Sequence, residues 1–279
     1  MWRKERVFLT IRIEVRCLGL SYLYIELTTT AGMATLTYLL DGTFRHEDHL
    51  GNAGKLEPHD VQMMIAGRGI LHAEMPVHGP GMPNPTGLQL WIDLPREMKM
   101  ITPQYEEVKA KDMPTAHPSP DVMVRVICGE SDGGEGEGVV AALVRKVAGC
   151  WFLDAALADA GSTFFQRLPK GWNAFLYVLD GEVQVGDNGA GLRPSVAKTF
   201  HTAFLSAEEE STGVRLTAHG DKGARFVIVA GEPLNQPVVQ YGPMVMNTQQ
   251  EIRQAFMDYK LGQNGFENAH TWASTIGAA

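Results

Sequence analysis

Cysteine and basic residues are both scarce in this sequence of 279 residues. The only cysteines are Cys17, Cys128 and Cys150, an odd and widely spaced set that provides neither a disulfide framework nor a zinc motif. Such cysteine usage favours a reducing compartment. Lys and Arg number 24 against 32 Asp and Glu, so the formal net charge is −8. This balance argues against direct nucleic-acid binding through a basic surface and leaves docking onto another protein open.

Long apolar runs are also lacking. No run reaches the roughly 18–20 residues that a membrane span requires, so we expect no membrane partner. The charged residues Arg3, Lys4, Glu5 and Arg6 precede an apolar segment at 7–9, which resembles the start of a signal peptide. Charged residues at 12, 14 and 16 then interrupt any apolar core. We therefore expect a protein that is not secreted and that lies in the cytoplasm, the nucleus or both.

Glycine and proline are abundant, and they favour an all-β fold. The chain has 30 Gly and 15 Pro with 44% hydrophobic residues, which suits a turn-rich β protein. The segment YLLDG at 38–42 returns as YVLDG at 177–181, which predicts two copies of one β module. Asp41-Gly42 predicts a hairpin with a return strand over 43–48. The polar, proline-bearing segment 106–121 predicts the linker.

One helix is predicted near the end of the chain. Thr248 stands three residues before Glu251, as in a capping box. Ile252, Ala255 and Tyr259 then recur at helical spacing, together with Phe256, up to Gly262. We expect this helix to pack outside a β-barrel and to carry no chemistry.

The most informative segment for chemistry is 54–76, GKLEPHDVQMMIAGRGILHAEMP. Gly67 and Gly69 predict a sharp reversal, and the residues after it have strand composition. Side chains two apart in a strand share a face, so His72 and Glu74 project together. An imidazole and a carboxylate on one face are two members of a possible divalent-metal site. The alternative is an ordinary surface pair on an edge strand.

Many motifs together resemble the pirin family of the cupin superfamily. They are YLLDG (38–42), HED (46–48), AGRGILHAEMP (66–76), GLQLWIDLP (87–95), PQY (103–105), PKGW (169–172), AGEPLNQPVVQYGPMVMNT (230–248) and NGFE (264–267). The resemblance spans about residues 33–277. It implies two tandem cupin (RmlC-like jelly-roll) β-barrels with a C-terminal helix, a bicupin. We expect an N-terminal barrel over 1–120, with 1–32 atypical, and a C-terminal barrel with the helix over 121–279.

The same resemblance implies one Fe(II) in the N-terminal barrel, held by an HPH motif and a later His and Glu. The later pair corresponds to His72 and Glu74, which makes both candidate metal ligands. The HPH positions are Thr28, Thr29 and Thr30 in this chain, and Ala34 replaces the glutamate that usually follows. Since hydroxyls are poor ligands beside imidazole, we expect a two-ligand site that binds Fe(II) weakly.

His46 and His49 are the nearest candidates for replacement ligands, whereas His59 is expected to face solvent. In the second barrel the corresponding positions are Arg167, Leu168 and Pro169, and no His-x-Glu pair accompanies the strand 226–230, so this copy is expected to be metal-free and structural. The unfamiliar residues 1–27 beside faithful motifs suggest a mis-spliced or mispredicted first exon, which sequencing of the transcript's 5′ end would test.

The resemblance implies two classes of function. The first is quercetin 2,3-dioxygenase-type oxidoreduction of a small flavonol-like aromatic substrate, in which His72 holds the metal and Glu74 is a ligand and catalytic base. The second is a non-catalytic transcription cofactor, or a metal-deficient pirin, that acts by binding a transcription-factor protein. A third alternative is a truncated product that folds poorly, because missing strands would leave edges unpaired. We expect a monomer.

Overall fold

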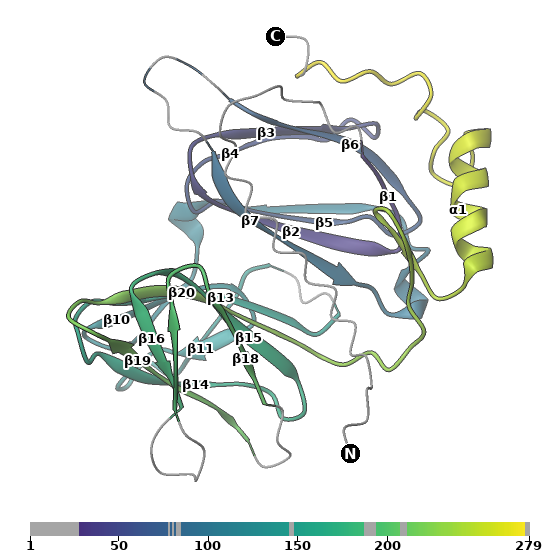
Figure 1. The fold of residues 1–279 in the computed structure, drawn as a ribbon. Helices are drawn as coiled ribbons and strands as arrows, with labels where there is room; N and C mark the ends of the chain where they lie inside the picture. Colours follow the sequence, from purple (N-terminus) through teal and green to yellow (C-terminus); the bar gives the residue numbers. More distant parts are fainter. Residues whose placement is uncertain are drawn as a thin grey trace. The chain divides into compact units, whose positions relative to one another are not determined.

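The computed structural model describes residues 28–77, 79, 81, 85–144, 148–186, 194–206 and 211–276. The chain divides into two units. The first contains the described residues up to Asp112 together with those from Leu234 onward, and the second is Met113–Pro233. Strands dominate both units, and the described part of the chain has one α-helix (Figure 1). The all-β expectation is confirmed.

Two four-stranded antiparallel sheets build the barrel of the first unit. In Figure 1, β3, β4 and β6 lie over β2, β5 and β7. One sheet has the strand order β1 (Thr28–Thr30), β6 (Ile70–Pro76), β3 (Phe44–Asp48) and β4 (Ala53–Leu56). The other has the order β7 (Thr86–Asp93), β2 (Met33–Asp41), β5 (Val61–Ile65) and β8 (Gln104–Val108). Two short 3-10 turns, η1 (Arg96–Met98) and η2 (Ala110–Asp112), flank β8.

The second unit repeats this plan with one larger sheet. A six-stranded sheet has the order β18 (Thr202–Leu205), β15 (Asn173–Asp180), β20 (Ala224–Gly231), β13 (Cys150–Leu157), β10 (Val122–Cys128) and β9 (Thr115–Ser119). A four-stranded sheet has the order β14 (Thr163–Arg167), β19 (Gly213–His219), β16 (Glu182–Val185) and β17 (Ser195–Lys198). A small pair, β11 (Glu130–Asp132) and β12 (Val139–Ala141), completes the unit.

The strand predicted over 43–48 forms as β3, but the predicted hairpin pairing across Asp41-Gly42 is wrong. Strand β2 pairs with β5 and β7, whereas β3 pairs with β4 and β6 in the other sheet. The turn forms as expected locally, with Gly42 at φ 77° and its N–H donating to Asp41 Oδ1 at 2.8 Å. It carries the chain from one sheet to the other, because a jelly roll connects its two layers at such corners. The repeat at Asp180-Gly181 does the same between β15 and β16.

The residues from Leu234 onward group with the first unit, which differs from the expected division at residue 120. Polar contacts show why. Gln236 Nε2 donates to Asp93 Oδ2 at 3.0 Å, and the buried Lys99 Nζ donates to the carbonyls of Gly32 and Val245 at 2.9 and 3.0 Å. The boundary after Asp112 lies inside the predicted linker, but that segment also contains the end of β8 and all of β9.

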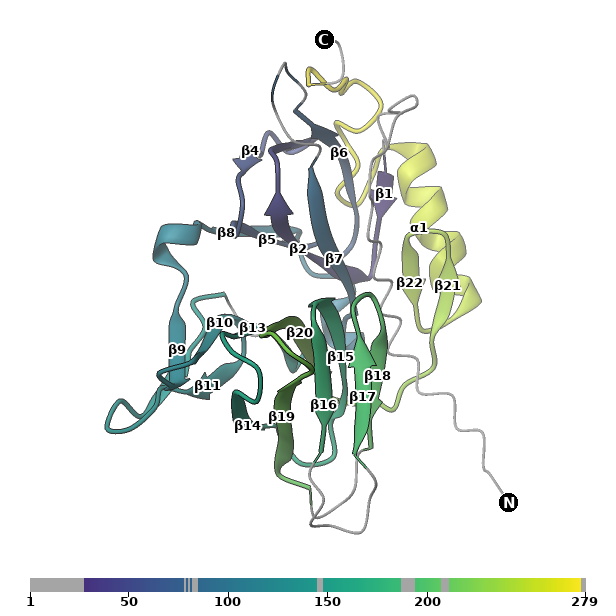
Figure 2. The ribbon, with the colours of Figure 1, turned by 60° about the vertical axis from the view of Figure 1, so that its left-hand side comes forward.

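The C-terminal helix forms as predicted. Helix α1 (Gln249–Leu261) begins after Thr248, whose Oγ1 accepts from the Glu251 N–H at 3.2 Å, and ends at Gly262 with φ 62°. It packs through Ile252 and Ala255 against the hairpin β21 (Val239–Tyr241) and β22 (Met244–Met246). Figure 2 shows the helix beside this hairpin. Among the described residues no helix is long and apolar enough to cross a membrane.

Candidate functional site

His72 and Glu74 lie on β6, directly after the predicted reversal. Gly67 and Gly69 have φ 51° and 146°, and a Cβ on Gly69 would lie 2.1 Å from the ring of Phe266, so the turn requires glycine there. The two side chains share one face of β6 because they are two residues apart. Strand β6 is flanked by β1 and β3, and His72 is only 6% exposed. The alternative of a surface pair on an edge strand is therefore wrong.

The neighbours of this pair come from both adjacent strands. His72 is paired in register with Thr28 on β1 and with Asp48 on β3. Glu74 is paired with His46. Residues opposite one another in a sheet point to the same face, so β6 and β3 place two histidines and two carboxylates on one face.

The facing sheet holds Glu74 in place. Gln89 on β7 donates through Nε2 to both carboxylate oxygens of Glu74, at 3.4 and 3.2 Å, and to Thr37 Oγ1 at 3.2 Å. Trp91 Nε1 in turn donates to Gln89 Oε1 at 2.9 Å, which fixes the orientation of the amide. These bonds cross from one sheet to the other, so Glu74 points into the interior of the first barrel.

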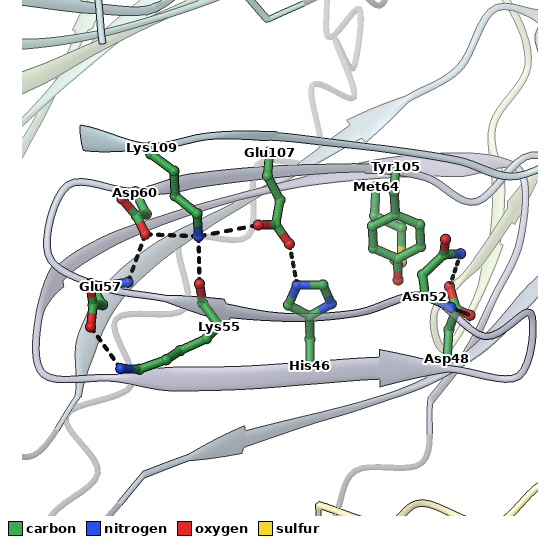
Figure 3. A network of polar contacts seen from close by, with 10 residues as sticks. All are labelled: His46, Asp48, Asn52, Lys55, Glu57, Asp60, Met64, Tyr105, Glu107 and Lys109. Atoms are coloured by element: carbon green, nitrogen blue, oxygen red, sulfur yellow. Dashed lines mark hydrogen bonds and ion pairs between the residues drawn. The ribbon is translucent and has the colours of Figure 1, made fainter. Parts of the chain in front are cut away.

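A second polar group joins the open edges of the two sheets (Figure 3). His46 on β3, 3% exposed, bonds through Nε2 to Glu107 Oε1 on β8 at 2.6 Å. Lys109 Nζ lies 3.2 Å from Glu107 Oε2 and donates to the Lys55 carbonyl at 2.6 Å and to Asp60 Oδ2 at 3.1 Å. Strands β4 and β8 are both edge strands, so this network closes the seam between the sheets.

The carboxylate of this seam is held ionised. The hydrogen bond from His46 lowers the pKa of Glu107 below 4.5; partial burial opposes this effect, and Lys109 reinforces it through its hydrogen bond and its charge. Sequence reasoning missed Glu107, because it fell in the predicted linker and lies 61 residues from His46 in the chain.

Tyr105 completes this part of the interior. Its ring stacks on the His46 imidazole with centroids 5.8 Å apart and planes at 5°, and its hydroxyl donates to Met64 Sδ at 2.9 Å. Burial raises the pKa of Tyr105 well above 10, and repulsion from Asp48, Glu74 and Glu107 adds to the effect. The hydroxyl therefore stays protonated, and the negative charges of three carboxylates are concentrated around it.

The other candidate histidines have structural partners. His49 is 4% exposed; its Nδ1 accepts from the Leu71 N–H at 3.1 Å, and its Nε2 donates to the Gly265 carbonyl at 2.8 Å. Both ring nitrogens thus form hydrogen bonds with the backbone, so neither is available to bind a metal ion. His59 is half-buried and bonds through Nδ1 to Tyr38 Oη at 3.0 Å, so it faces solvent less than expected.

The residues present do not fit the four-ligand iron site that the resemblance implies. Register places Thr28 beside His72, and Thr30 on the same short strand is 2% exposed. A hydroxyl is a much weaker ligand for Fe(II) than an imidazole. Across the described ranges, no three His, Cys, Asp or Glu side chains gather closely enough to hold a metal ion. His72 and Glu74 remain as two ligand-type side chains.

The second barrel carries no equivalent of this pair. Pairing shows that the counterpart of β6 is β19, rather than the strand 226–230 named from the sequence: β16 pairs with β19 as β3 pairs with β6. By this register, Val214 and Leu216 stand where His72 and Glu74 stand. Of the three positions named earlier, Arg167 ends β14 and Leu168 packs against the apolar core.

Comparisons with known proteins agree with this architecture. Family models match residues 24–92 as Pirin and residues 152–265 as the Pirin C-terminal cupin domain. Mouse pirin is 44% identical over 249 residues, covering 88% of this chain and 79% of its own length. A tomato pirin-like protein is 42% identical over 243 residues, covering 87% and 77% of the two chains.

A solved structure is similar across both barrels. The crystal structure of a quercetin 2,3-dioxygenase from Acinetobacter baumannii is 30% identical, covers 86% of this chain and 78% of its own, and superposes with a TM-score of 0.71. Together with the two jelly-roll units, these matches show that the chain belongs to the pirin family, in the cupin superfamily.

Proposed function

We propose that this chain is a metal-deficient pirin whose N-terminal barrel binds a flavonol-like aromatic molecule without oxygenating it. The observation that carries the proposal is the register of β1, which puts Thr28 in the place beside His72 where the family's first histidine is expected. Two ligand-type side chains leave most coordination positions to water, and so give weak metal affinity.

The residues that line the first barrel support the ligand class. Glu74 and Gln89 provide an acceptor and a donor that are oriented by the facing sheets, and Tyr105 and Trp91 provide aromatic surface. A few oriented polar groups among aromatic side chains are typical of small-molecule sites. The quercetin 2,3-dioxygenase to which this chain is similar acts, by its name, on a flavonol.

Iron content is the first test. We expect the purified chain to hold far less than one iron per molecule after incubation with Fe(II), and the variant Thr28→His with Thr30→His to approach one, because two imidazoles complete the ligand set. Elemental analysis measures both. The matched control is Gln166→His with Leu168→His, since Gln166 pairs with Val214 as Thr28 pairs with His72; this control should gain no iron. Stoichiometric iron in the unaltered chain would refute the proposal.

Quercetin 2,3-dioxygenase-type catalysis is the second candidate, favoured by the similarity to the Acinetobacter enzyme. In it, His72 and Glu74 would hold Fe(II), which would supply the reactivity toward O₂, and Glu74 would also be the candidate base for the flavonol hydroxyl. Oxygen consumption with quercetin, measured with and without added Fe(II), separates the two candidates. Turnover that depends on added iron in the unaltered chain favours catalysis.

A transcription-factor protein is the other partner class that the family implies. The net charge of −8 permits docking onto a basic protein surface, and a role in the nucleus belongs with this reading. Capture of a defined transcription factor by the purified chain, unchanged when quercetin is absent and when O₂ is excluded, would favour it.

A further inference from the structure

The buried imidazole of His46 uses only one of its two nitrogens within the protein. Nε2 bonds to Glu107 at 2.6 Å, whereas Nδ1 is buried and has no hydrogen-bond partner among the described residues. His46 is 3% exposed, so bulk water does not readily satisfy Nδ1. An unsatisfied buried polar atom destabilises the fold, so native proteins contain few of them, and each one calls for an explanation.

Glu107 determines what Nδ1 can do. Because the Glu107 carboxylate is ionised it only accepts, so Nε2 must carry a proton. In the neutral imidazole, Nδ1 then has a lone pair and accepts a hydrogen bond. The sheet register places His46 opposite Glu74, and Figure 3 shows Nδ1 on the side of the ring toward Tyr105.

The fold makes room for this pair. A Cβ on Gly54 would lie 2.2 Å from Glu107 Oε1 and 2.3 Å from His46 Nε2. Strand β4 therefore passes so close over the hydrogen bond that only glycine leaves space for it. The hydrogen bond between His46 and Glu107 therefore depends on a glycine at position 54, which a chance surface contact would not require.

The surrounding charges select the form of a ligand. The negative charges of Asp48, Glu74 and Glu107 all disfavour an anion near Tyr105. The cation Lys109 forms an ion pair with Glu107 and lies on the side of that carboxylate away from His46. An anionic ligand would be repelled here, whereas a neutral hydroxyl can donate its proton to an acceptor. The Tyr105 ring, stacked on His46, offers a flat aromatic face beside that acceptor.

From these contacts we propose that Nδ1 of His46 accepts a hydrogen bond from a hydroxyl group of a neutral phenolic ligand inside the first barrel, and that Glu107 is the positioning residue that fixes the required tautomer. This proposal rests on the proposed function, and it names the group that recognises the ligand. It assigns the recognition to β3 and β8, separate from His72.

The test is equilibrium binding of quercetin, without O₂ and with a chelator, followed by fluorescence. His46→Phe keeps a ring to stack on Tyr105 and removes the acceptor, so the dissociation constant should rise about tenfold or more. Glu107→Gln should weaken binding less, because either tautomer of His46 then becomes possible. The control is Glu106→Gln, which changes the same charge on the other face of β8 and should leave affinity unchanged.

A second ligand distinguishes recognition from damage to the fold. Fully O-methylated quercetin has no hydroxyl donors, so His46→Phe should not weaken its binding further; a loss of equal size for both ligands would mean that the substitution only perturbs the barrel and would overturn the proposal. The absorption spectrum of bound quercetin should remain that of the neutral form, and a phenolate spectrum would contradict the charge argument.

The two proposals fail in different ways. If the unaltered chain does not bind quercetin, the proposed function is wrong and this inference falls with it. If the unaltered chain binds quercetin and His46→Phe binds it equally well, only the inference is wrong.

Discussion

The two barrels of this chain have related backbones and opposite interiors. Val185 is the counterpart of His46 in the second barrel, 139 residues later, which is the spacing of the sequence repeat. His46 pairs with Glu74 and Val185 pairs with Leu216, so Leu216 is the counterpart of Glu74. The second interior is filled mainly by aliphatic and aromatic side chains, among them Leu176 and Phe226, both 0% exposed. Strand order thus specifies the barrel, whereas a few inward positions specify whether the barrel can recognise a polar ligand.

The largest effect is expected from exchanging the interior residues. Leu216→Glu puts an unpaired carboxylate into a hydrocarbon core and should lower the free energy of unfolding by about 4–5 kcal/mol. The reverse change, Glu74→Leu, should cost less than about 1.5 kcal/mol, because it removes a carboxylate and leaves only Gln89 short of one acceptor. Urea unfolding of both variants measures the difference. Equal losses of stability would contradict the claim that the two interiors differ in their tolerance of a carboxylate.

A smaller but still large effect is expected from the buried lysine of the first unit. Lys99 is 2% exposed, and its three donors reach Asp93 at 2.5 Å and two backbone carbonyls. Burial lowers the pKa of Lys99, and the bond to Asp93 opposes that effect. Lys99→Met should cost about 3 kcal/mol, because it leaves a largely buried carboxylate without its cation.

The second unit offers the matched control for that lysine. Lys222 pairs with Asp180 at 2.8 Å, but their side chains are 59% and 64% exposed. Lys222→Met should therefore change stability by no more than about 1 kcal/mol, since exposed ion pairs contribute little. A cost as large as that of Lys99→Met would show that burial does not govern the difference.

The smallest effect is expected from Glu47, whose contribution to stability depends on pH. Burial opposes ionisation of Glu47, but hydrogen bonds from Thr275 and Ile276 outweigh it and lower its pKa below 4.5. A lowered carboxyl pKa stabilises the fold above the ordinary value of 4.5, and that stabilisation is lost as the pH falls through the folded-state pKa. Glu47→Gln should thus cost about 1 kcal/mol at pH 7 and have a diminishing effect below pH 4.5.

Melting temperature against pH checks this prediction. Glu57→Gln is the control, since that side chain is 60% exposed and pairs with Lys55 at the surface. If the two variants lose stability in parallel across the whole range, the C-terminal segment does not depend on the charge of Glu47.

Local signals in the sequence were enough for much of the fold. The Thr248–Glu251 capping box predicted α1, and the glycines at 67 and 69 predicted the turn before His72 and Glu74. These features depend on neighbouring residues, and local backbone chemistry determines them. The alternation of side chains on β6 was equally readable, because its period belongs to the strand itself.

Features that depend on distant partners were not predictable in this way. The Asp41-Gly42 turn was recognised, but the sheet that each flanking strand joins depends on the whole barrel. Glu107 lies in a polar segment that resembled a linker, and only the fold brings it to His46. The grouping of β21 and β22 with the first unit likewise depends on contacts such as that between Lys99 and Val245.

The discontinuous first unit has a consequence for the order in which the protein folds. The second unit is one continuous segment, so all of its strands have been synthesised before Val245 leaves the ribosome. Lys99 cannot complete its hydrogen bonds until Val245 arrives, although Gly32 was made much earlier. The barrel that comes first in the chain is therefore finished last, and during synthesis the unfinished barrel is the part most exposed to aggregation and chaperone binding.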